Sequence, residues 1–265
     1  KVSGIHRLKP TVMMEVCLAV YRMSSNNLPN AKRFGEAGGC DGVISALSDH
    51  QDLDVVCGAA CEAIISLSVD SSNLTHICTL RISEKLCTVL RCHISNPLVV
   101  TSVCKALSVL AKNESQQQIL RNNGACTLVV DALQMHANDI NVFIATVNAI
   151  ASLSLDASNA TAMGLLNICQ HVNTYLEQYR GNAEVISHLT YAVFMLLNSP
   201  HNCVYFGVSS MYKILVENMQ IHGNEIKLAL NTCLVLQKLS LSEEQRAIAG
   251  SSGVCECLVN VLLNH

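Results

Sequence analysis

The sequence predicts an all-α solenoid, a stack of three-helix repeats with a period of about 43 residues. The first observation is a series of small residues in which every step after the first is 43 residues. Its members are Ala19, Ala63, Ala106, Ala149, Ala192 and Val235, and the first step is 44. A leucine lies four residues after each member except the first, where the equivalent residue is Met23. A fixed period of this length is the signature of a repeat architecture, in which neighbouring repeats bury each other's apolar faces.

Two further apolar series and one series of turn-forming residues keep the same spacing. The apolar series are Phe34, Ile77, Leu120, Met163, Phe206 and Ala249, and Leu47, Leu90, Leu133, Leu176, Met219 and Leu262. The turn series contains Gly38, Gly124 and Gly253, with Asn167 and Ser210 at equivalent positions and Arg81 out of type. Because Gly and Asn adopt the left-handed conformation that closes a helix, this series predicts a helix end in each repeat.

Length and composition agree with a helical stack and argue against several other classes of protein. The 265 residues exceed what one compact core usually holds, whereas a solenoid has no such limit. A net charge of −3 offers no basic surface, so we expect no nucleic-acid partner. No apolar run reaches the roughly 18 residues of a membrane-spanning helix. The N-terminal segment KVSGIHRLKP lacks the apolar centre of a signal peptide.

The 14 cysteines fall mostly at apolar helical positions rather than in loops. Five of them lie on the helices of the alanine series: Cys17, Cys57, Cys61, Cys104 and Cys233. A free cysteine at such a position behaves as a small hydrophobic residue. We therefore expect packed thiols rather than disulfides, and a reducing compartment, which means the cytoplasm or alternatively the nucleus.

The elements of the first repeats follow from local signals. Pro10 suits the start of a helix over residues 10–24, and the loop at 25–29 contains the one extra residue of the 44-residue step. A short helix over 30–37 ends at Gly38 and Gly39, and a second helix over 40–47 and a long third helix over 52–68 follow. The same short, medium and long pattern then recurs.

Later repeats show the same order with clear helix caps. Asn96 precedes Pro97 at one third-helix start, and Asp139 caps another, in which Ile140, Phe143 and Val147 keep helical spacing. The expected helices are 72–81, 83–92 and 96–112; 114–122, 126–135 and 139–155; 158–166, 168–179 and 182–197; 201–207, 209–221 and 224–241; and 243–249 and 254–263. We expect a single domain over 1–265, with repeats at 10–25 (partial), 30–68, 72–112, 114–155, 158–197, 201–241 and 243–265 (partial).

The repeat resembles the armadillo repeat over about residues 10–264. The segments that carry the resemblance are Asn30–Gly39 (NAKRFGEAGG), Gln116–Gly124 (QQQILRNNG), Ala63–Ser68 (AIISLS) and Ala149–Ser154 (AIASLS). The resemblance implies a right-handed superhelix whose third helices line a concave groove that binds extended peptides or partner proteins. It does not specify the partner, because armadillo arrays have many functions.

The sequence differs from the nuclear-import adaptors of this family, whose groove carries Trp just before the alanine position and Asn three residues after it. The preceding positions here are Leu18, Glu62, Lys105, Asn148, Tyr191 and Leu234, and the later ones are Arg22, Ser66, Val109, Ser152, Met195 and Lys238. Neither set forms a Trp or Asn ladder, so the chain does not resemble a typical import adaptor. Nor is this groove a basic trough of the kind that holds acidic partners.

These positions lie on one side of each long helix, and they define the groove row that we predict to bind a partner. The groove row is Arg22, Glu62, Ser66, Lys105, Asn148, Ser152, Tyr191, Met195 and Lys238. Tyr191 with Met195 is the expected anchor, because buried aromatic side chains dominate interface energies. Two alternatives are that neighbouring segments cover this row, or that the convex face binds the partner.

Other candidate chemistry has simpler explanations. Cys57 and Cys61 with nearby Cys87, Cys92 and His93 match no usual zinc spacing, so we predict no metal and no cofactor. His188, next to the groove row, is a candidate contact or a locally bonded surface histidine. The run at 243–246 is a solvated helix face. No phosphate loop, nucleophile with its base, or carboxylate pair is present, so we predict no catalytic residues and no enzyme activity.

The leading functional hypothesis is a non-enzymatic scaffold or regulatory arm that binds a peptide or partner protein in the groove. The alternatives are a chaperone-type or cytoskeletal adaptor, the repeat arm of a larger signalling or motor enzyme, and, more remotely, a metal or redox protein. The final helix, 254–263, is apolar nearly all round, so we expect another element to pack against it. We expect this cover from a longer chain, with a further helix at about 268–284, from a second copy by end-to-end association, or from another protein. Alternatively, the helix tucks against Leu239 and Leu241.

Overall fold

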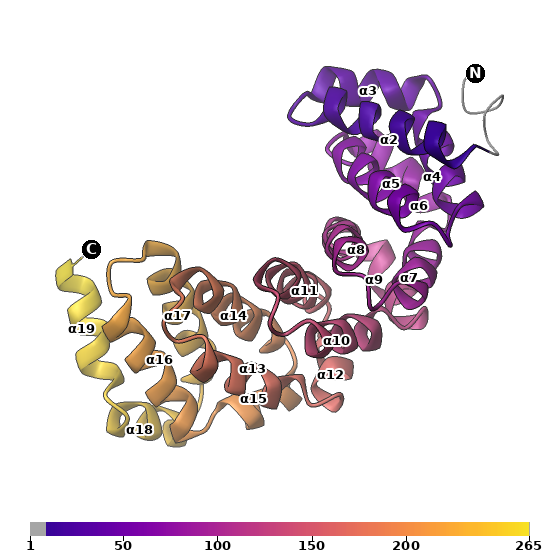
Figure 1. Cartoon of the computed structure of the whole chain (residues 1–265). Helices are drawn as coiled ribbons and strands as arrows, with labels where there is room; N and C mark the ends of the chain where they lie inside the picture. The colour runs from indigo at the N-terminus through magenta and orange to yellow at the C-terminus, as the bar shows by residue number, and fades with distance from the viewer. Residues whose placement is uncertain (1–8, 265) are drawn as a thin grey trace. The chain divides into compact units, whose positions relative to one another are not determined.

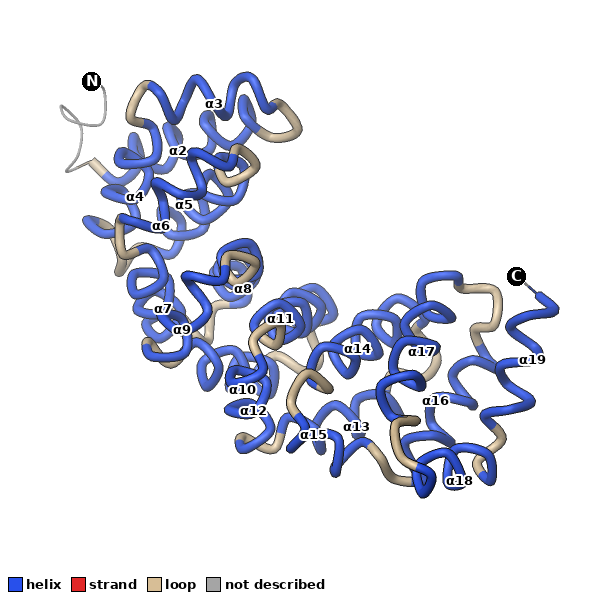
Figure 2. Tube along the Cα trace, turned by 180° about the vertical axis from the view of Figure 1, so that it is seen from behind, coloured by secondary structure: helices blue, strands red, loops and turns tan. Residues whose placement is uncertain are grey.

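The computed structural model describes residues 9–264, and all regular structure in that range is helical (Figures 1 and 2). Eighteen helices, α2 to α19, follow one another in the described residues, which contain no strand. The predicted all-α solenoid is confirmed. Helix ends agree with the predicted ranges to within two residues at nearly every position, and the predicted spans 114–122 and 209–221 are reproduced by α9 and α16.

The helices fall into three classes that recur in order. The first helices are α3 (Leu28–Glu36), α6 (Ser71–Thr79), α9 (Glu114–Asn122), α12 (Ala157–Leu165), α15 (Pro200–Phe206) and α18 (Glu243–Ser251). The second helices are α4 (Gly39–Asp49), α7 (Ile82–Cys92), α10 (Ala125–Met135), α13 (Ile168–Gln178), α16 (Ser209–Ile221) and α19 (Val254–Asn264). The third helices are α2 (Pro10–Ser24), α5 (Asp54–Leu67), α8 (Pro97–Leu110), α11 (Ile140–Leu153), α14 (Ala183–Leu196) and α17 (Ile226–Leu239).

Polar side chains cap the helix starts as the sequence predicts. The Asn96 side chain accepts a hydrogen bond from the backbone N–H of Leu98 at 3.0 Å. Asp139 does the same for Asn141 at 3.0 Å. These bonds satisfy N–H groups that have no partner within the helix itself, which fixes where α8 and α11 begin.

The turn series adopts the left-handed conformation at Gly38, Gly124 and Asn167. Arg81 also does so, with φ of 56°, although it is not a glycine. The prediction that Ser210 lies at a helix end is wrong, because α16 already begins at Ser209. The residue before this helix is Val208, whose backbone is extended with φ of −114°. The chain therefore enters this one helix from an extended residue, and Ser210 lies inside the first helical turn.

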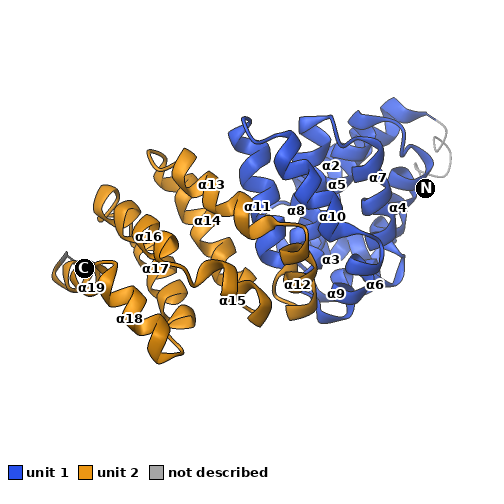
Figure 3. Cartoon of the chain, turned by 90° about the horizontal axis from the view of Figure 1, so that it is seen from below, with its two compact units in different colours: residues 1–152 blue, residues 153–265 orange. Residues whose placement is uncertain are grey.

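The chain separates into two compact units, with the boundary between Ser152 and Leu153 at the end of α11 (Figure 3). From the sequence, we expect a single domain over 1–265. In the first unit α5 packs against α2, α4 and α8; in the second unit α14 packs against α13 and α17. Within each unit these contacts join a helix to its own repeat or the adjacent one, as expected for a solenoid.

The alanine series lies at the centre of this packing. Ala63, Ala106, Ala149 and Ala192 are all completely buried. A second link between repeats comes from the histidines that follow the second helices. His93 Nε2 donates to the backbone oxygen of Gln51 at 2.8 Å, and equivalent bonds join His136 to Ile94 at 2.7 Å and His222 to Arg180 at 2.6 Å.

No single helix in residues 9–264 has both the length and the apolar composition needed to cross a membrane. Helices α18 and α19 meet that criterion only when taken together, and the pair is bent by 73°.

Candidate partner-binding surface

In the first unit, the groove row places charged residues on adjacent third helices. Glu62 on α5 is half-buried, and its Oε1 lies 3.5 Å from Lys105 Nζ on α8. The same oxygen accepts a hydrogen bond from the Ser102 hydroxyl at 3.3 Å. Arg22, near the end of α2, is exposed. The charges of Glu62 and Lys105 compensate each other, which leaves Arg22 as the remaining charge of the groove row in the first unit.

Ser66 and Met195 do not offer their side chains to a partner as the sequence analysis expected. Ser66 is only 4% exposed, and its hydroxyl oxygen lies 2.7 Å from that of Ser24 on α2. Met195 is 9% exposed within the core of the second unit. Ser66 is buried because α2 packs against α5. A residue three positions after the alanine series therefore lies beneath the neighbouring third helix. Asn148 and Ser152 on α11 are half-buried.

In the second unit, Tyr191 is accessible with 37% of its surface exposed. Its ring lies 6.4 Å from that of Phe194, centroid to centroid, with the two planes inclined by 37°. Phe194 is half-buried and replaces Met195 as the neighbour of Tyr191 on the accessible side. Aromatic pairs of this geometry are mutually stabilising and present an apolar face to a partner.

Lys238 on α17 is a positive charge held in a fixed position. Its Nζ donates to the backbone oxygen of Phe194 at 2.9 Å and to Asn198 Oδ1 at 2.6 Å, and it lies 4.0 Å from the centroid of the Phe194 ring. Desolvation by burial lowers the pKa of Lys238, and the neighbouring Cys203 thiol opposes this shift. The cation therefore sits against an aromatic ring, at the edge of the apolar surface.

Exposed apolar side chains accompany the groove row in both units, and the sequence analysis did not identify them. In the first unit, Val55 on α5 and Leu98 on α8 are 57% and 78% exposed. In the second unit, Ile226 and Leu230 on α17 and Leu241 after it are 72%, 58% and 80% exposed. Val55 and Leu98 precede Glu62 and Lys105 by seven residues, and Leu230 precedes Lys238 by eight, so helical spacing places them on the same side. One feature of the sequence could have identified these residues: they are large and apolar, yet none of them belongs to the apolar series that repeat every 43 residues.

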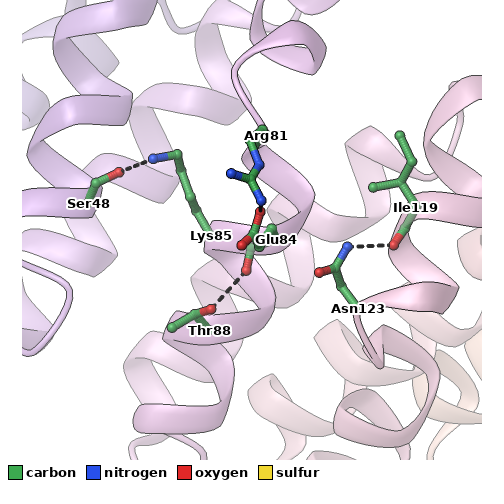
Figure 4. A network of polar contacts seen from close by, with 7 residues as sticks. All are labelled: Ser48, Arg81, Glu84, Lys85, Thr88, Ile119 and Asn123. Carbon is green, nitrogen blue, oxygen red and sulfur yellow. Dashed lines mark hydrogen bonds and ion pairs between the residues drawn. The ribbon is translucent and has the colours of Figure 1, made fainter.

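A second candidate is a cleft that recurs between neighbouring second helices. It measures about 180 Å³ between α4 and α7 and about 400 Å³ at the equivalent place between α13 and α16. Figure 4 shows the first of these, where Lys85 Nζ donates to the Ser48 hydroxyl at 2.6 Å and Arg81 lies 2.5 Å from Glu84. Because the basic side chains Arg81 and Lys85 already have partners within the chain, we assign the α4–α7 cleft no ligand.

The thiols and histidines behave as packed side chains. Nine of the 14 cysteines are buried, and desolvation raises the pKa of Cys57 and of Cys104 to about 12. The Cys57 thiol donates to the backbone oxygen of Gln51 at 3.3 Å. Burial lowers the pKa of His188 below its ordinary value, with smaller effects from Glu184 and Lys227. Within residues 9–264, no three His, Cys, Asp or Glu side chains are grouped so that they could hold a metal ion.

Comparison with models of protein families finds no match, and comparison with curated proteins finds no relative. Among solved structures, an engineered protein superimposes with a TM-score of 0.81 at 16% identity, over 95% of this chain and 60% of that one. A chain from a study of a phosphorylation switch controlling the interaction between cadherin and β-catenin gives a TM-score of 0.70 at 15% identity, over 92% and 52%. At these identities the likeness shows the helical solenoid fold alone. The chain spans less than two thirds of either structure.

Proposed function

We propose that this chain is a non-enzymatic module that binds a partner protein or an extended peptide along the exposed side of its third helices. The observation that carries this proposal is the exposure of Val55, Leu98, Ile226 and Leu230 beside the groove row. Large apolar side chains that gather on one face of a soluble protein mark interaction surfaces. Other apolar residues of the same helices, such as Ile64 on α5 and Leu236 on α17, are buried.

The two units contribute different chemistry to this surface. The first unit offers Val55 and Leu98 near the Glu62–Lys105 pair. The second offers the Tyr191–Phe194 ring pair and the fixed ammonium group of Lys238. A partner segment that alternates apolar and polar side chains would meet apolar contacts and hydrogen-bonding groups on either unit taken by itself. Tyrosine, together with Trp and Arg, is among the residues that usually dominate such interfaces.

The cellular setting belongs to the same proposal. Buried thiols such as Cys61 and Cys104, both without exposed surface, suit the reducing environment of the cytoplasm or nucleus. The likeness to a chain from a cadherin and β-catenin study supports a role in protein binding only by analogy of fold. We propose no catalytic role, because no residue of the groove row has the neighbours that nucleophilic or acid–base catalysis requires.

The test compares two tyrosines of equal exposure. Tyr191 on α14 is 37% exposed and Tyr205 on α15, a first helix, is 39% exposed. Tyr191→Asp introduces a charge into the proposed surface, whereas Tyr205→Asp introduces the same charge away from it. Each variant is used to capture proteins from cell lysate, and the captured proteins are quantified against the wild type by mass spectrometry.

We expect a defined set of proteins to be lost with Tyr191→Asp and retained with Tyr205→Asp. Circular dichroism and thermal unfolding establish that both variants are folded. If both variants retain the same set, or if Tyr205→Asp alone loses it, the third-helix surface is not the binding site.

A further inference from the structure

The cleft between α13 and α16 lies inside the second unit, at the same repeat positions as the cleft between α4 and α7 in the first unit. Every residue that lines it lies three periods of 43 residues after a residue that lines the first cleft. The two clefts nevertheless differ in volume, with about 180 Å³ in the first unit and about 400 Å³ in the second. Because the positions are the same, the side chains at these positions determine what each cleft can bind.

A lysine spans the first cleft, and its equivalent in the second cleft is an isoleucine. Lys85 donates to the Ser48 hydroxyl on the facing helix at 2.6 Å. Ile214 occupies the position of Lys85, is 8% exposed and has no polar group with which to reach across. Together with Leu176, which has no exposed surface, it gives the second cleft an apolar floor. A volume of about 400 Å³ is within the range of small-molecule sites.

One buried residue that lines the second cleft is polar where the other second helices are apolar. Asn218 is 2% exposed. Its equivalents in the other second helices are Ala46, Val89, Ala132, Tyr175 and Val261. The Asn218 Nδ2 atom is buried and has no hydrogen-bond partner in residues 9–264. A buried donor without an acceptor lowers the stability of a protein, so an asparagine at this position calls for an acceptor supplied from the cleft.

Four exposed charged side chains surround the second cleft, and each of its two walls carries both signs. Glu177 on α13 and Arg180 just after that helix belong to one wall. Lys213 and Glu217 on α16 belong to the other. Within residues 9–264, none of the four takes part in an ion pair. The second cleft thus offers two positive and two negative groups to a ligand, whereas the basic side chains of the first cleft already have partners.

We propose that the α13–α16 cleft binds a free amino acid with an apolar side chain. The carboxylate of the ligand accepts hydrogen bonds from the two basic side chains and supplies the acceptor that Asn218 Nδ2 lacks. The ammonium group of the ligand donates to Glu177 and Glu217. The apolar side chain of the ligand packs on Leu176 and Ile214.

A zwitterion is the class of ligand that fits, because the walls of the cleft carry both signs of charge. A simple anion would pair with the basic side chains but would place its charge beside two glutamates, and a simple amine would meet the opposite conflict. Such like-charge contacts weaken binding. A zwitterion pairs both of its charges. The cleft lies between second helices and contains no residue of the groove row, so this inference is independent of the proposed function.

The decisive variant is Asn218→Val, which gives the second cleft the residue that the first cleft has at Val89. It removes the buried donor without a partner, so the midpoint of thermal unfolding should be unchanged or higher. Ligand binding should weaken by at least about tenfold, because the buried polar contact is lost. Val89→Asn is the matched control: it should lower the unfolding midpoint and leave ligand binding unchanged.

A second variant acts at the rim, where a substitution leaves the packed floor intact. Arg180→Gln removes one of the two positive charges, and Arg180 is exposed, so folding should be unaffected. Binding of the ligand carboxylate loses one of its two charged partners. We expect the dissociation constant to rise by about tenfold.

Binding is measured by NMR titration of the isotope-labelled chain with L-leucine. Three matched analogues test the charges: 4-methylpentanoate lacks the ammonium group, 3-methylbutylamine lacks the carboxylate, and N-acetyl-L-leucine amide lacks both charges but keeps peptide groups. L-leucine should shift the amide resonances of α13 and α16 along a saturating curve. Each analogue should bind at least about tenfold more weakly.

Three outcomes would overturn the proposal. The first is that L-leucine produces no saturating shift at α13 and α16 up to its limit of solubility. The second is that an analogue binds as tightly as L-leucine; if it is N-acetyl-L-leucine amide, the cleft recognises a peptide instead. The third is that Asn218→Val and Arg180→Gln both bind L-leucine like the wild type, which would place the ligand elsewhere.

Discussion

The side-chain amide of Asn202 donates a hydrogen bond to the backbone oxygen of Ala160, 42 residues earlier, at 2.9 Å. The same nitrogen donates to the oxygen of Leu196 at 2.9 Å, so one buried amide joins α15 both to the preceding first helix and to the end of α14. Asn202 has no exposed surface. Inside a protein such a bond is strengthened by the low local dielectric constant.

Asn202→Ala should therefore lower the free energy of unfolding by about 1–3 kcal/mol, since two buried hydrogen bonds are lost. Urea denaturation followed by circular dichroism gives this value. Asn141→Ala, at an exposed position on α11, is the control and should change it by less than about 0.5 kcal/mol. Equal effects of the two substitutions would show that the buried amide contributes little.

Gly164→Ala and Gly58→Ala should have opposite signs. A methyl group at Gly164 would lie 1.9 Å from Asn202 Oδ1, so we expect a loss of about 1–3 kcal/mol from overpacking. A methyl group at Gly58 meets nothing within 4 Å inside α5, so we expect a gain of about 1 kcal/mol from helix propensity. Thermal and urea unfolding of the two variants in parallel measure both. A stabilised Gly164→Ala would contradict the proximity of the amide.

Arg81→Gly should stabilise the protein. Arg81 has φ of 56°, a conformation that costs an L-residue about 1–2 kcal/mol. Glycine removes this cost at an entropic penalty of about 0.5–1 kcal/mol, so a net gain of about 0.5–1 kcal/mol is expected. The ion pair of Arg81 with Glu84 is exposed and contributes little.

The control for Arg81→Gly is Arg91→Gly in the same helix. Arg91 lies within α7 and is not among the residues with positive φ, so glycine there should destabilise the protein by about 1 kcal/mol. Denaturant unfolding of the two variants should therefore shift in opposite directions. A shift to lower stability for both would mean that the backbone at Arg81 carries no strain.

Thiol reactivity should divide the cysteines by position. Cys92 and Cys255 are exposed and should react with an aromatic disulfide reagent at the rate of a free thiol. Cys61 and Cys104 are completely buried, and burial raises the pKa of Cys104 to about 12, so they should react only when the protein opens. Mass spectrometry of quenched samples identifies the labelled residues, and all 14 should react in concentrated guanidinium chloride.

Three further buried thiols predict that the free energy of unfolding falls in alkali. Desolvation raises the pKa of Cys17 to about 11 and that of Cys87 and Cys169 to about 12, from an ordinary value of 9.0. The folded state therefore binds protons that the unfolded state releases, and the stabilisation is complete below pH 9 and declines as the pH rises toward 11–12. Urea unfolding measured between neutral pH and pH 11 should show this decline. A Cys104→Ala variant should show a smaller decline in the free energy of unfolding over the same pH range.

The sequence by itself determined the repeat and its helices. Period, helix order and most boundaries follow from local signals, because a helix depends on residues three and four positions apart and on caps such as Asp139 and Asn96. The alanine series was identifiable for the same reason: Ala149 recurs at one helical phase in every repeat. These features require no knowledge of which helix lies beside which.

Only the tertiary structure decided which side chains are accessible. Ser66 and Met195 share the helical phase of accessible groove-row residues, yet neighbouring packing buries them. Arg81 takes a left-handed conformation because the turn requires it, against the preference of its residue type. The different surroundings of Gly164 and Gly250 likewise depend on whether a following repeat covers them. The exposure of a side chain and the strain of a backbone turn depend on contacts between residues that are far apart in the sequence. A local sequence pattern contains no information about those contacts.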